Sequence, residues 1–194
     1  MFDLMVLVRK KLIGIICSAI LFCFTGFSLN AGTLGGSADL VLGQPDYTHG
    51  AANSVKSAGL DAPYSVAFDT NTGRAYVCDS TNNRVLWWDN SASLASGQNA
   101  DGVLGQPDML SNTAAITRAG MSSPQSVFVD STGNVYIASR TKSIEIYSPA
   151  GERIGQIEVP QRPTNLCFGG KDGKTLLITT IPAAYTIRMR VKGR

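Results

Sequence analysis

Charged residues, histidine and cysteine are all scarce in this chain. Charged residues make up only 16% of the 194 positions, and His49 is the single histidine. A Ser–His–Asp site needs an oriented base, and His49 lies in a polar loop with no obvious partner, so the sequence does not indicate such a site. The hydrophobic share of 44% excludes a disordered chain, because it is enough to bury a core.

The low net charge argues against nucleic acid as a partner. The whole chain carries a formal charge of +3 at pH 7. Arg9, Lys10, Lys11 and Asp3 lie in a segment that is predicted to be removed, and without them 14 basic and 13 acidic side chains remain. A nearly neutral protein has no field strong enough to recruit a phosphate backbone.

Residues 1–31 are predicted to be a signal peptide, followed by a linker at 32–37. Three basic residues at 9–11 precede the apolar run 12–24, and small or polar residues follow it. The protein is therefore expected to be exported, to the periplasm or the extracellular space. A membrane anchor is the alternative if the segment is not cleaved, since the run is just long enough to span a bilayer. A buried cytosolic helix is a further alternative.

Only two of the four cysteines would survive this processing. Cys78 and Cys167 each lie in the middle of a predicted strand, where a small apolar residue would pack. An exported protein can form disulfides, but nothing in the spacing shows that these two thiols meet. Two separate buried thiols are favoured over a bridge.

The chain is rich in glycine and in internal repetition. Residues 59–89 recur, with a one-residue deletion, from Gly120 onwards, and a fainter third copy begins at Pro163. The segment Val-Leu-Gly-Gln-Pro-Asp occurs identically at 41–46 and 103–108. Self-similarity of this size predicts an array of equivalent structural units.

Each unit is predicted to consist of short strands. No convincing helical period occurs after residue 32, whereas runs of β-branched and aromatic residues alternate with turn residues. The predicted strands are Ala38–Gly43, Ser65–Asp69, Arg74–Cys78, Arg84–Trp88, Gly102–Gly105, Ser126–Asp130, Asn134–Ala138, Ser143–Tyr147, Arg153–Val159, Asn165–Phe168, Lys174–Thr179 and Tyr185–Val191.

Residues 38–194 are therefore predicted to form an all-β domain, a β-propeller of four-stranded blades. A sandwich is the alternative, but it would not explain why one unit recurs in register. The chain contains about three blades, and a closed ring needs at least four. The last unit lacks a fourth strand, and Ala38–Gly43 lacks the rest of its blade. A second copy of the chain is a candidate partner, because Ala38–Gly43 of one copy would add to the edge strand Tyr185–Val191 of the other.

Two families share these motifs. The first unit resembles bacterial NHL-repeat proteins through VLGQPD and PYSVAFD…GRAYVCDSTNNRVLWW. The second half is similar to the gluconolactonase/senescence-marker-protein/luciferin-regenerating family through PQSVFVDSTGNVYIAS, IYSPAGERIGQIEVP and PTNLCFGGKDGKTLLITT. Both resemblances imply six-bladed propellers. The chain is thus expected to be about half of one ring, preceded by an N-terminal hydrophobic signal helix.

The second resemblance also implies a metal site at the corners where inner strands begin. In that family, carboxylates and an asparagine hold a divalent metal. The matching corners here are Pro63-Tyr64-Ser65, Pro124-Gln125-Ser126 and Pro163-Thr164-Asn165. Gln125 replaces the ligand aspartate and Tyr64 the asparagine, while the first carboxylate would come from an early blade that the sequence lacks.

Neutral groups bind hard cations weakly, so no cofactor is expected from these corners. Calcium or another divalent metal would be needed only if the protein is a lactonase. Tyr64, Gln125, Thr164 and Asn165 are the candidate residues that line a groove, and no catalytic residue is assigned. The simplest role of Asn165 is a hydrogen bond at the start of its strand.

Four further polar residues are expected to be structural. Asp69 and Asp130 each open a hairpin turn that contains a downstream glycine. Asp79 and Asn83 fit the NHL turn pattern and are expected to hold the backbone rather than a ligand.

Three functional hypotheses follow. The first is an exported propeller module that serves as a non-catalytic scaffold for binding or assembly. The second is a metal-dependent lactone hydrolase of the gluconolactonase type, active only if assembly supplies the missing ligands. The third is a truncated product without an independent role.

Overall fold

The computed structural model describes residues 38–50, 55–115 and 120–193. The chain divides into two compact units, residues 1–39 and 40–194. The predicted signal peptide and linker lie outside the described residues, so export stays a prediction. Within the described ranges, no helix is both long and apolar enough to cross a membrane.

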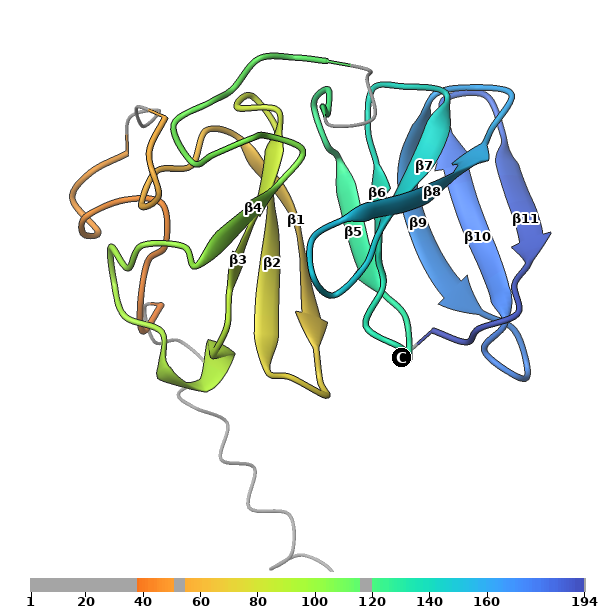
Figure 1. The fold of residues 1–194 in the computed structure, drawn as a ribbon, viewed down its shortest axis with the longest axis horizontal. Helices are drawn as coiled ribbons and strands as arrows, with labels where there is room; N and C mark the ends of the chain where they lie inside the picture. The colour runs from red at the N-terminus through yellow and green to blue at the C-terminus, as the bar shows by residue number, and fades with distance from the viewer. Residues whose placement is uncertain (1–37, 51–54, 116–119, 194) are drawn as a thin grey trace, which may run out of the picture. The chain divides into compact units, whose positions relative to one another are not determined.

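The second unit consists of three antiparallel sheets (Figure 1). The first sheet has the order β1-β2-β3-β4, the second β5-β6-β7-β8, and the third has three strands in the order β11-β10-β9. A short 3₁₀ turn, η1, covers Ser91–Ser93. The strands are β1 (Pro63–Asp69), β2 (Arg74–Asp79), β3 (Arg84–Trp88), β4 (Gly102–Leu104), β5 (Ser126–Val129), β6 (Val135–Ala138), β7 (Ser143–Tyr147), β8 (Arg153–Glu158), β9 (Pro163–Gly169), β10 (Thr175–Thr180) and β11 (Ala184–Arg188).

Eleven of the predicted strands form, and β3 and β7 have the predicted bounds. The all-β prediction is confirmed for the described residues, and three repeated sheets are consistent with part of a propeller. Within the part of the chain that the structure describes, the third sheet has three strands and no fourth, as predicted. The predicted and observed strands agree because more buried and more exposed residues alternate along the chain, as in β10 and β11. Such an alternation is expected for a strand with one side facing the core.

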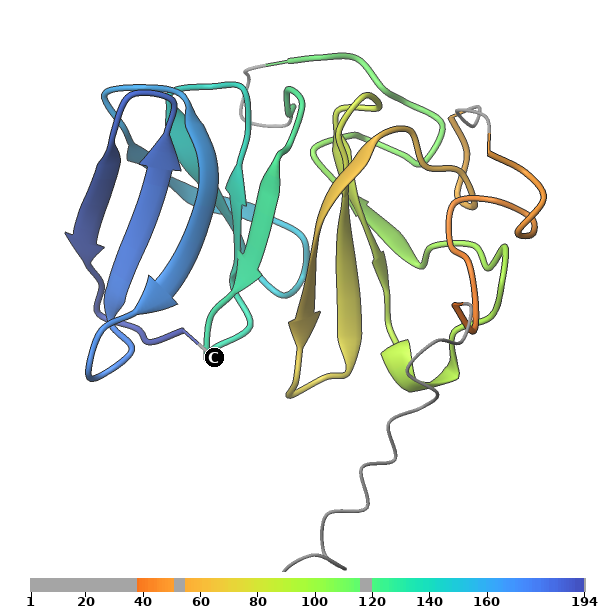
Figure 2. The same ribbon diagram turned by 180° about the vertical axis from the view of Figure 1, so that it is seen from behind.

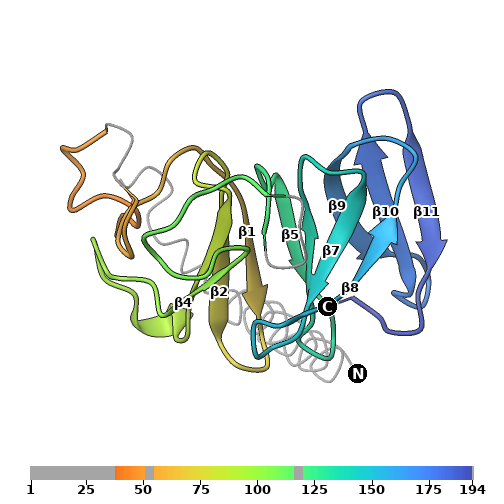
Figure 3. The ribbon, with the colours of Figure 1, turned by 45° about the horizontal axis from the view of Figure 1, so that its top comes forward.

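Neighbouring sheets pack face to face through two apolar clusters. The first and second sheets share a cluster that includes Tyr76, Val85, Leu104, Val127 and Val135, and the second and third share one built around Tyr136 and Leu176. The inner strands β1, β5 and β9 lie side by side at one edge of the stack (Figures 2 and 3). All three sheets therefore begin at the same end of that edge.

The two copies of Val-Leu-Gly-Gln-Pro-Asp take equivalent places. Gly43 and Gly105 have φ values of +84° and +80°, which favour glycine. A side-chain carbon at Gly43 would lie 2.6 Å from Leu60, and one at Gly105 would lie 2.5 Å from Met121. Leu60 and Met121 in turn precede β1 and β5. Each copy thus packs on a residue that leads into the sheet that follows it.

The prediction of a strand at Ala38–Gly43 is nevertheless wrong. The segment is bent, and Val41 bonds to a loop: its amide donates to Ser96 Oγ at 3.2 Å, and its carbonyl accepts from the amide of Gly97 at 3.0 Å. The second copy is a strand because β3 pairs with it. The first copy has no such neighbour among the described residues, and a strand forms only on a partner.

Candidate functional site

The candidate residues lie at the corners where the inner strands begin. Pro63-Tyr64-Ser65 opens β1, Gln125 and Ser126 precede and open β5, and Pro163-Thr164-Asn165 opens β9. The strands are neighbours, so their starts meet at one end of the sheet edge. The side chain of Tyr64 is 64% exposed and Asn165 is exposed, while Gln125 and Thr164 are half-buried.

Serine hydroxyls link these corners to one another. Ser65 Oγ accepts a hydrogen bond from the Val127 amide at 3.2 Å. Ser126 Oγ donates to Asn165 Oδ1 at 2.6 Å, and the Leu166 amide donates to the same oxygen at 2.8 Å. The expected strand-start role of Asn165 is thereby confirmed. Ser65 and Ser126 hold adjacent sheets in register, which the sequence analysis did not identify.

The other candidates are positioned separately. Thr164 Oγ1 donates to the Thr179 carbonyl at 3.2 Å, within its own sheet. The main-chain amide of Gln125 donates to the Ala138 carbonyl at 2.7 Å, which anchors the backbone at that corner. Tyr64 lines a hollow of about 220 Å³ with Val66 and Val77 on the open face of the first sheet. The structure brings together the Ser126 and Asn165 corners, while a groove shared by all four candidates stays a prediction.

The corner side chains by themselves are poor ligands for a hard cation. Their polar groups are neutral, and Asn165 Oδ1 already accepts two hydrogen bonds. Across the ranges that the structure describes, no group of three or more His, Cys, Asp or Glu residues is placed to hold a metal. Since calcium requires several oxygen ligands and prefers carboxylates, a metal here would need ligands from outside these corners.

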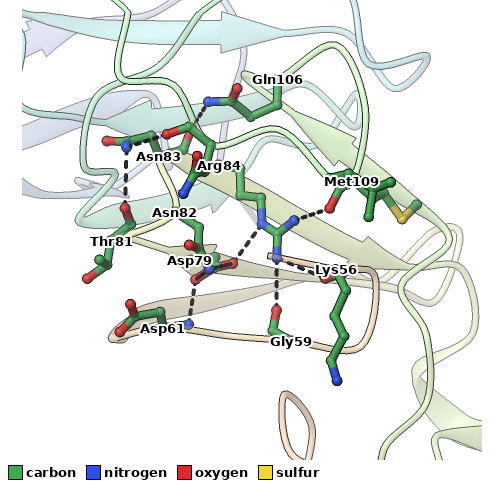
Figure 4. A network of polar contacts seen from close by, with 12 residues as sticks. Lys56, Gly59, Asp61, Asp79, Thr81, Asn82, Asn83, Arg84, Gln106 and Met109 are labelled. Atoms are coloured by element: carbon green, nitrogen blue, oxygen red, sulfur yellow. Dashed lines mark hydrogen bonds and ion pairs between the residues drawn. The ribbon is translucent and has the colours of Figure 1, made fainter. Parts of the chain in front are cut away.

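An ion pair that is fully buried lies at the turn between β2 and β3 (Figure 4). Arg84 Nε donates to Asp79 Oδ2 at 2.7 Å, and both side chains are 0% exposed. The remaining guanidinium nitrogens donate to three backbone carbonyls, those of Met109, Lys56 and Gly59, at 2.6, 3.0 and 2.9 Å. Such complete pairing is what allows two charges to be buried.

Asp79 uses its other oxygen in the same network. Asp79 Oδ1 accepts from the Asp61 amide at 2.7 Å and from Asn82 Nδ2 at 3.1 Å. The network therefore ties the segments before β1 and after β4 to the turn. Sequence reasoning missed Arg84 because three of its four partners are main-chain carbonyls at distant positions, and no side-chain pattern marks them.

Asn83 holds the backbone next to this network. Its Nδ2 donates to the carbonyls of Thr81 and Asn112, at 3.3 and 2.9 Å, and its Oδ1 accepts from the Ser123 amide at 2.9 Å. Its φ of +54° lies in the left-handed region, which asparagine tolerates better than most residues. The structural roles predicted for Asp79 and Asn83 are confirmed.

The two hairpin aspartates also behave as predicted. Asp69 Oδ1 accepts from the Asn71 amide at 2.9 Å, and Asp130 Oδ1 accepts from the amides of Thr132 and Asn134, at 2.8 and 3.0 Å. Both residues therefore stabilise turns.

His49 has a partner that the sequence analysis did not find. Its Nδ1 lies 2.7 Å from Asp46 Oδ1, and hydrogen bonds from Thr48 and His49 hold the pKa of Asp46 well below its usual range. The Thr48 hydroxyl faces the same ring nitrogen at 3.5 Å. A triad needs its hydroxyl and its carboxylate on different nitrogens, so the contact is a local turn rather than a nucleophilic site.

The two cysteines do not form a disulfide. Both are free thiols, as predicted, but only Cys78 is buried, whereas Cys167 is exposed on β9. Burial raises the pKa of the Cys78 thiol, which keeps it protonated and unreactive.

The comparisons with known proteins point to one family. A family model described as "SMP-30/Gluconolactonase/LRE-like region" matches residues 28–182. No curated protein matches the chain.

Several solved structures share the arrangement of strands. A putative gluconolactonase is 23% identical with a TM-score of 0.55, over 69% of this chain and 41% of that one. A luciferin-regenerating enzyme is 19% identical with a TM-score of 0.55, over 72% and 49%. A calcium-binding protein, regucalcin from Agrobacterium tumefaciens, is 20% identical with a TM-score of 0.53, over 71% and 49%. At these identities the likeness concerns the fold, and the chain spans less than half the length of each.

Proposed function

Because the chain belongs to the SMP-30/gluconolactonase/LRE-like family, we propose that it forms part of a hydrolase that opens lactones. The observation that carries this proposal is the family match over residues 28–182, which includes all strands of the first two sheets and most of the third. The competing hypothesis of a non-catalytic scaffold has no observation in its favour. The assignment to NHL-repeat proteins stays a prediction.

Hydrolysis of a lactone requires water to attack the ester carbonyl, with stabilisation of the oxyanion that forms. In this chain, Tyr64, Gln125 and Thr164 offer neutral donors and acceptors at the corners of the inner strands. We propose that these three side chains orient the oxygen atoms of the substrate. A charged group that activates water must come from outside these corners, and its source is the central question of the proposal.

We propose that a second copy of the chain completes the ring. Among the described residues the third sheet ends at β11 without a fourth strand, and the Val-Leu-Gly segment at 41–43 packs on Leu60 as the segment at 103–105 packs on Met121. If this segment were added to β11 of another copy, the third sheet would gain a fourth strand and the segment would gain a partner strand. The similar solved structures support such a ring, because each of those chains is more than twice as long as the part that this chain matches.

An exposed apolar stripe on β1 also supports this arrangement. Tyr64, Val66 and Phe68 alternate along the strand and are 64%, 57% and 52% exposed. They lie on the face of the first sheet that turns away from the second, because Ala67 between them packs on the shared cluster. Three large apolar side chains in a row are unusual on a free sheet face and typical of an interface.

The oligomeric mass tests ring completion directly. Light scattering on the mature protein is expected to give the mass of a dimer. Val66→Glu is expected to give a folded monomer, because it places a charge in the stripe without touching the shared core. Leu110→Glu is the matched control. Leu110 is a large apolar loop residue outside the stripe, and it is itself 74% exposed. A wild-type protein that is folded and monomeric would contradict the second-copy proposal while leaving the family assignment intact.

A hydrolysis assay tests the activity itself. We expect the dimer fraction to hydrolyse a simple sugar δ-lactone in the presence of Ca²⁺ or Zn²⁺, and EDTA to stop the reaction. We expect the monomeric Val66→Glu variant to show no metal-dependent turnover. A dimer that binds these metals but leaves the lactone intact would refute the proposed activity. A protein without a cooperative thermal transition would favour the truncated product.

A further inference from the structure

Two arginines that have no acidic partner among the described residues lie beside the corners where β5 and β9 begin. Arg140 lies in the turn between β6 and β7, and Arg162 lies in the connection between β8 and β9. Figure 1 shows both connections at the end of the sheets where β5 and β9 start. Two segments that are separate in the sequence therefore each bring a cation to the same end of these sheets.

Hydrogen bonds of the main chain fix the position of Arg140. Ser126 of β5 pairs with Ala138 of β6, so the turn that begins after Ala138 lies next to the start of β5. The Arg140 amide donates to the Ser122 carbonyl at 2.7 Å, which holds the turn against the segment that leads into β5. Arg140 is thus a neighbour of the Gln125 corner.

Arg162 reaches the same place from the third sheet. It lies three residues before Asn165, whose Oδ1 accepts the hydrogen bond from Ser126 at 2.6 Å. The Val159 amide donates to the Lys142 carbonyl at 2.8 Å, so the connection that contains Arg162 is bonded to the turn between β6 and β7. The backbone therefore brings the two arginines together.

No carboxylate of the described residues offsets the two charges. Arg140 is exposed and Arg162 is half-buried, and neither forms an ion pair with any residue that the structure describes. Burial and the nearby charge of Arg140 lower the pKa of Arg162, although a guanidinium stays protonated at neutral pH. Two like charges at short range repel each other, and a bound anion would offset this cost.

The outer side of the Arg162 guanidinium is accessible to such an anion. Its Nε is buried and has no hydrogen-bond partner among the described residues, so a ligand does not reach that atom. The residue as a whole is half-buried, and neither terminal nitrogen is both buried and unpaired, so both face solvent. Together with the exposed Arg140, these nitrogens offer the donors that the oxygens of a carboxylate or a phosphate accept.

The neighbouring corners suit the rest of such a ligand. Gln125 and Thr164 are half-buried and offer neutral donors and acceptors close to the two cations. A sugar derivative with one anionic group can therefore place its hydroxyl groups on the corners and its charge on the arginines. A neutral sugar would leave the two charges without a partner, so the arginines select for the anion.

We propose that Arg140 and Arg162 bind a carboxylate or phosphate group, and that the lactone opened by this protein carries such a group. The assignment of the substrate rests on the proposed hydrolase function, whereas the anion site does not.

Calorimetric titration of the purified protein tests the anion site with probes that contain no lactone. D-glucuronate and D-glucose 6-phosphate separate a carboxylate from a phosphate, and D-glucose is the neutral match. We expect at least one anion to bind with a dissociation constant on the order of 1 mM, at least about tenfold more tightly than D-glucose. Its affinity should fall as the salt concentration rises, because salt screens the charges. The proposal is overturned if neither anion binds more tightly than D-glucose.

The variants Arg140→Gln and Arg162→Gln test the location of the site. Each removes one charge, and each should weaken binding of the anion about tenfold, because a charge-assisted hydrogen bond is lost. Arg190→Gln is the matched control, since Arg190 is an exposed arginine beyond the end of β11. The control should bind the anion as the wild type does. An equal loss in all three variants would make binding a matter of net charge and overturn the site.

Thermal denaturation of these variants serves as the control for folding. Removal of one of two cations that repel each other should leave the melting temperature equal or raise it. Arg140 is exposed, so Arg140→Gln tests the site even if Arg162→Gln does not fold. Wild-type affinity in a folded Arg140→Gln protein would contradict the proposal.

Hydrolysis rates test the substrate class. The matched pairs are D-glucono-δ-lactone with its 6-phosphate, and D-glucono-γ-lactone with D-glucaro-γ-lactone, each corrected for spontaneous opening. We expect kcat/KM to be about tenfold higher for at least one anionic lactone than for its neutral match, and this preference to be lost in Arg140→Gln. Equal rates within both pairs would overturn the assignment of the substrate and leave the hydrolase function intact. Binding of the anions without opening of any lactone would support the anion site and refute the hydrolase function.

Discussion

The first two sheets have equivalent turns, between β2 and β3 and between β6 and β7, but different polar residues stabilise them. In the first sheet, Cys78 pairs with Val85 and the turn beyond them contains the buried Asp79–Arg84 ion pair. In the second, Ala138 pairs with Ile144, and Ser139 and Ser143 stand at the corresponding positions. The same backbone arrangement therefore accommodates two polar networks. In the first sheet the acid and the base are fully paired; in the second the network consists of hydroxyl groups, and Glu145 Oε2 has no partner among the described residues.

The difference shows where stability and binding can reside. The paired network joins three segments of the chain and offers no free polar atom for a ligand. Beside the second turn, Glu145 Oε2 is buried without a hydrogen-bond partner among the described residues. Repetition of a fold unit thus preserves the strands while the pairing of its buried polar residues diverges. The following predictions, from the largest effect to the smallest, test this contrast.

Arg84→Met should have the largest effect. It leaves the carboxylate of Asp79 buried without a cation, which costs about 3–5 kcal/mol of the free energy of unfolding. Urea denaturation measures the loss. Arg188→Met is the control, because Arg188 pairs with Asp172 at an exposed position, and its denaturation midpoint should stay at the wild-type value. Equal midpoints for the two variants would contradict a dominant role of the buried pair.

Asn83→Ala should cost about 2–3 kcal/mol, since it removes side-chain bonds to three backbone groups and places alanine at a positive φ. Asn83→Gly loses the same bonds but tolerates this conformation, so it should be about 1 kcal/mol more stable than Asn83→Ala. Thermal denaturation of both variants separates the two causes. If both melt at the same temperature, the backbone conformation makes no separate contribution.

Glu145→Gln should stabilise the protein by about 1–2 kcal/mol at neutral pH, because it removes a poorly paired acid from the interior. Burial raises the pKa of Glu145, although its hydrogen bond with Ser139 and the charge of Arg153 lower it. The folded state therefore holds this proton more tightly than the unfolded state does. Stability from the group is full below the ordinary pKa near 4.5 and is lost as the pH rises through the folded-state value.

The advantage of Glu145→Gln should accordingly vanish below the ordinary pKa near 4.5, grow as the pH rises from there to the folded-state pKa of Glu145, and stay constant above it. Denaturant titrations at pH 4 and pH 7 provide the measurement. Asp172→Asn, at an exposed ion pair, serves as the control for general charge effects. A constant difference between wild type and Glu145→Gln at both pH values would rule out the buried acid as its source.

Ser126→Ala should have a smaller effect, about 1 kcal/mol, and Ser65→Ala a still smaller one, about 0.5 kcal/mol. Ser126 donates to Asn165 across a sheet boundary, whereas Ser65 only accepts one backbone amide at 3.2 Å. Amide hydrogen exchange of Val127 and Leu166 reports each link separately. Faster exchange at neither amide would refute the role of the serines between sheets.

Much of the fold could be predicted, because strands and turns have local sequence patterns. The bounds of β3 and β7, the missing fourth strand of the third sheet and the hairpin roles of Asp69 and Asp130 all follow from alternation and turn residues. The candidate site was harder. Asn165 was placed correctly as a strand-start residue, but Arg84 and the Ser65 and Ser126 links were missed, since each depends on atoms brought in from another sheet or loop.

The chain of 194 residues determined by itself the period and order of its strands, and the glycines that its tight turns require. Hydrophobic alternation and turn chemistry act within a few residues, so the amino-acid order carries them directly. Only the tertiary structure decided which polar groups are paired and whether an extended segment becomes a strand. The carbonyls that satisfy Arg84 carry no side-chain identity, and the Val-Leu-Gly segment at 41–43 is a strand only when another strand lies beside it.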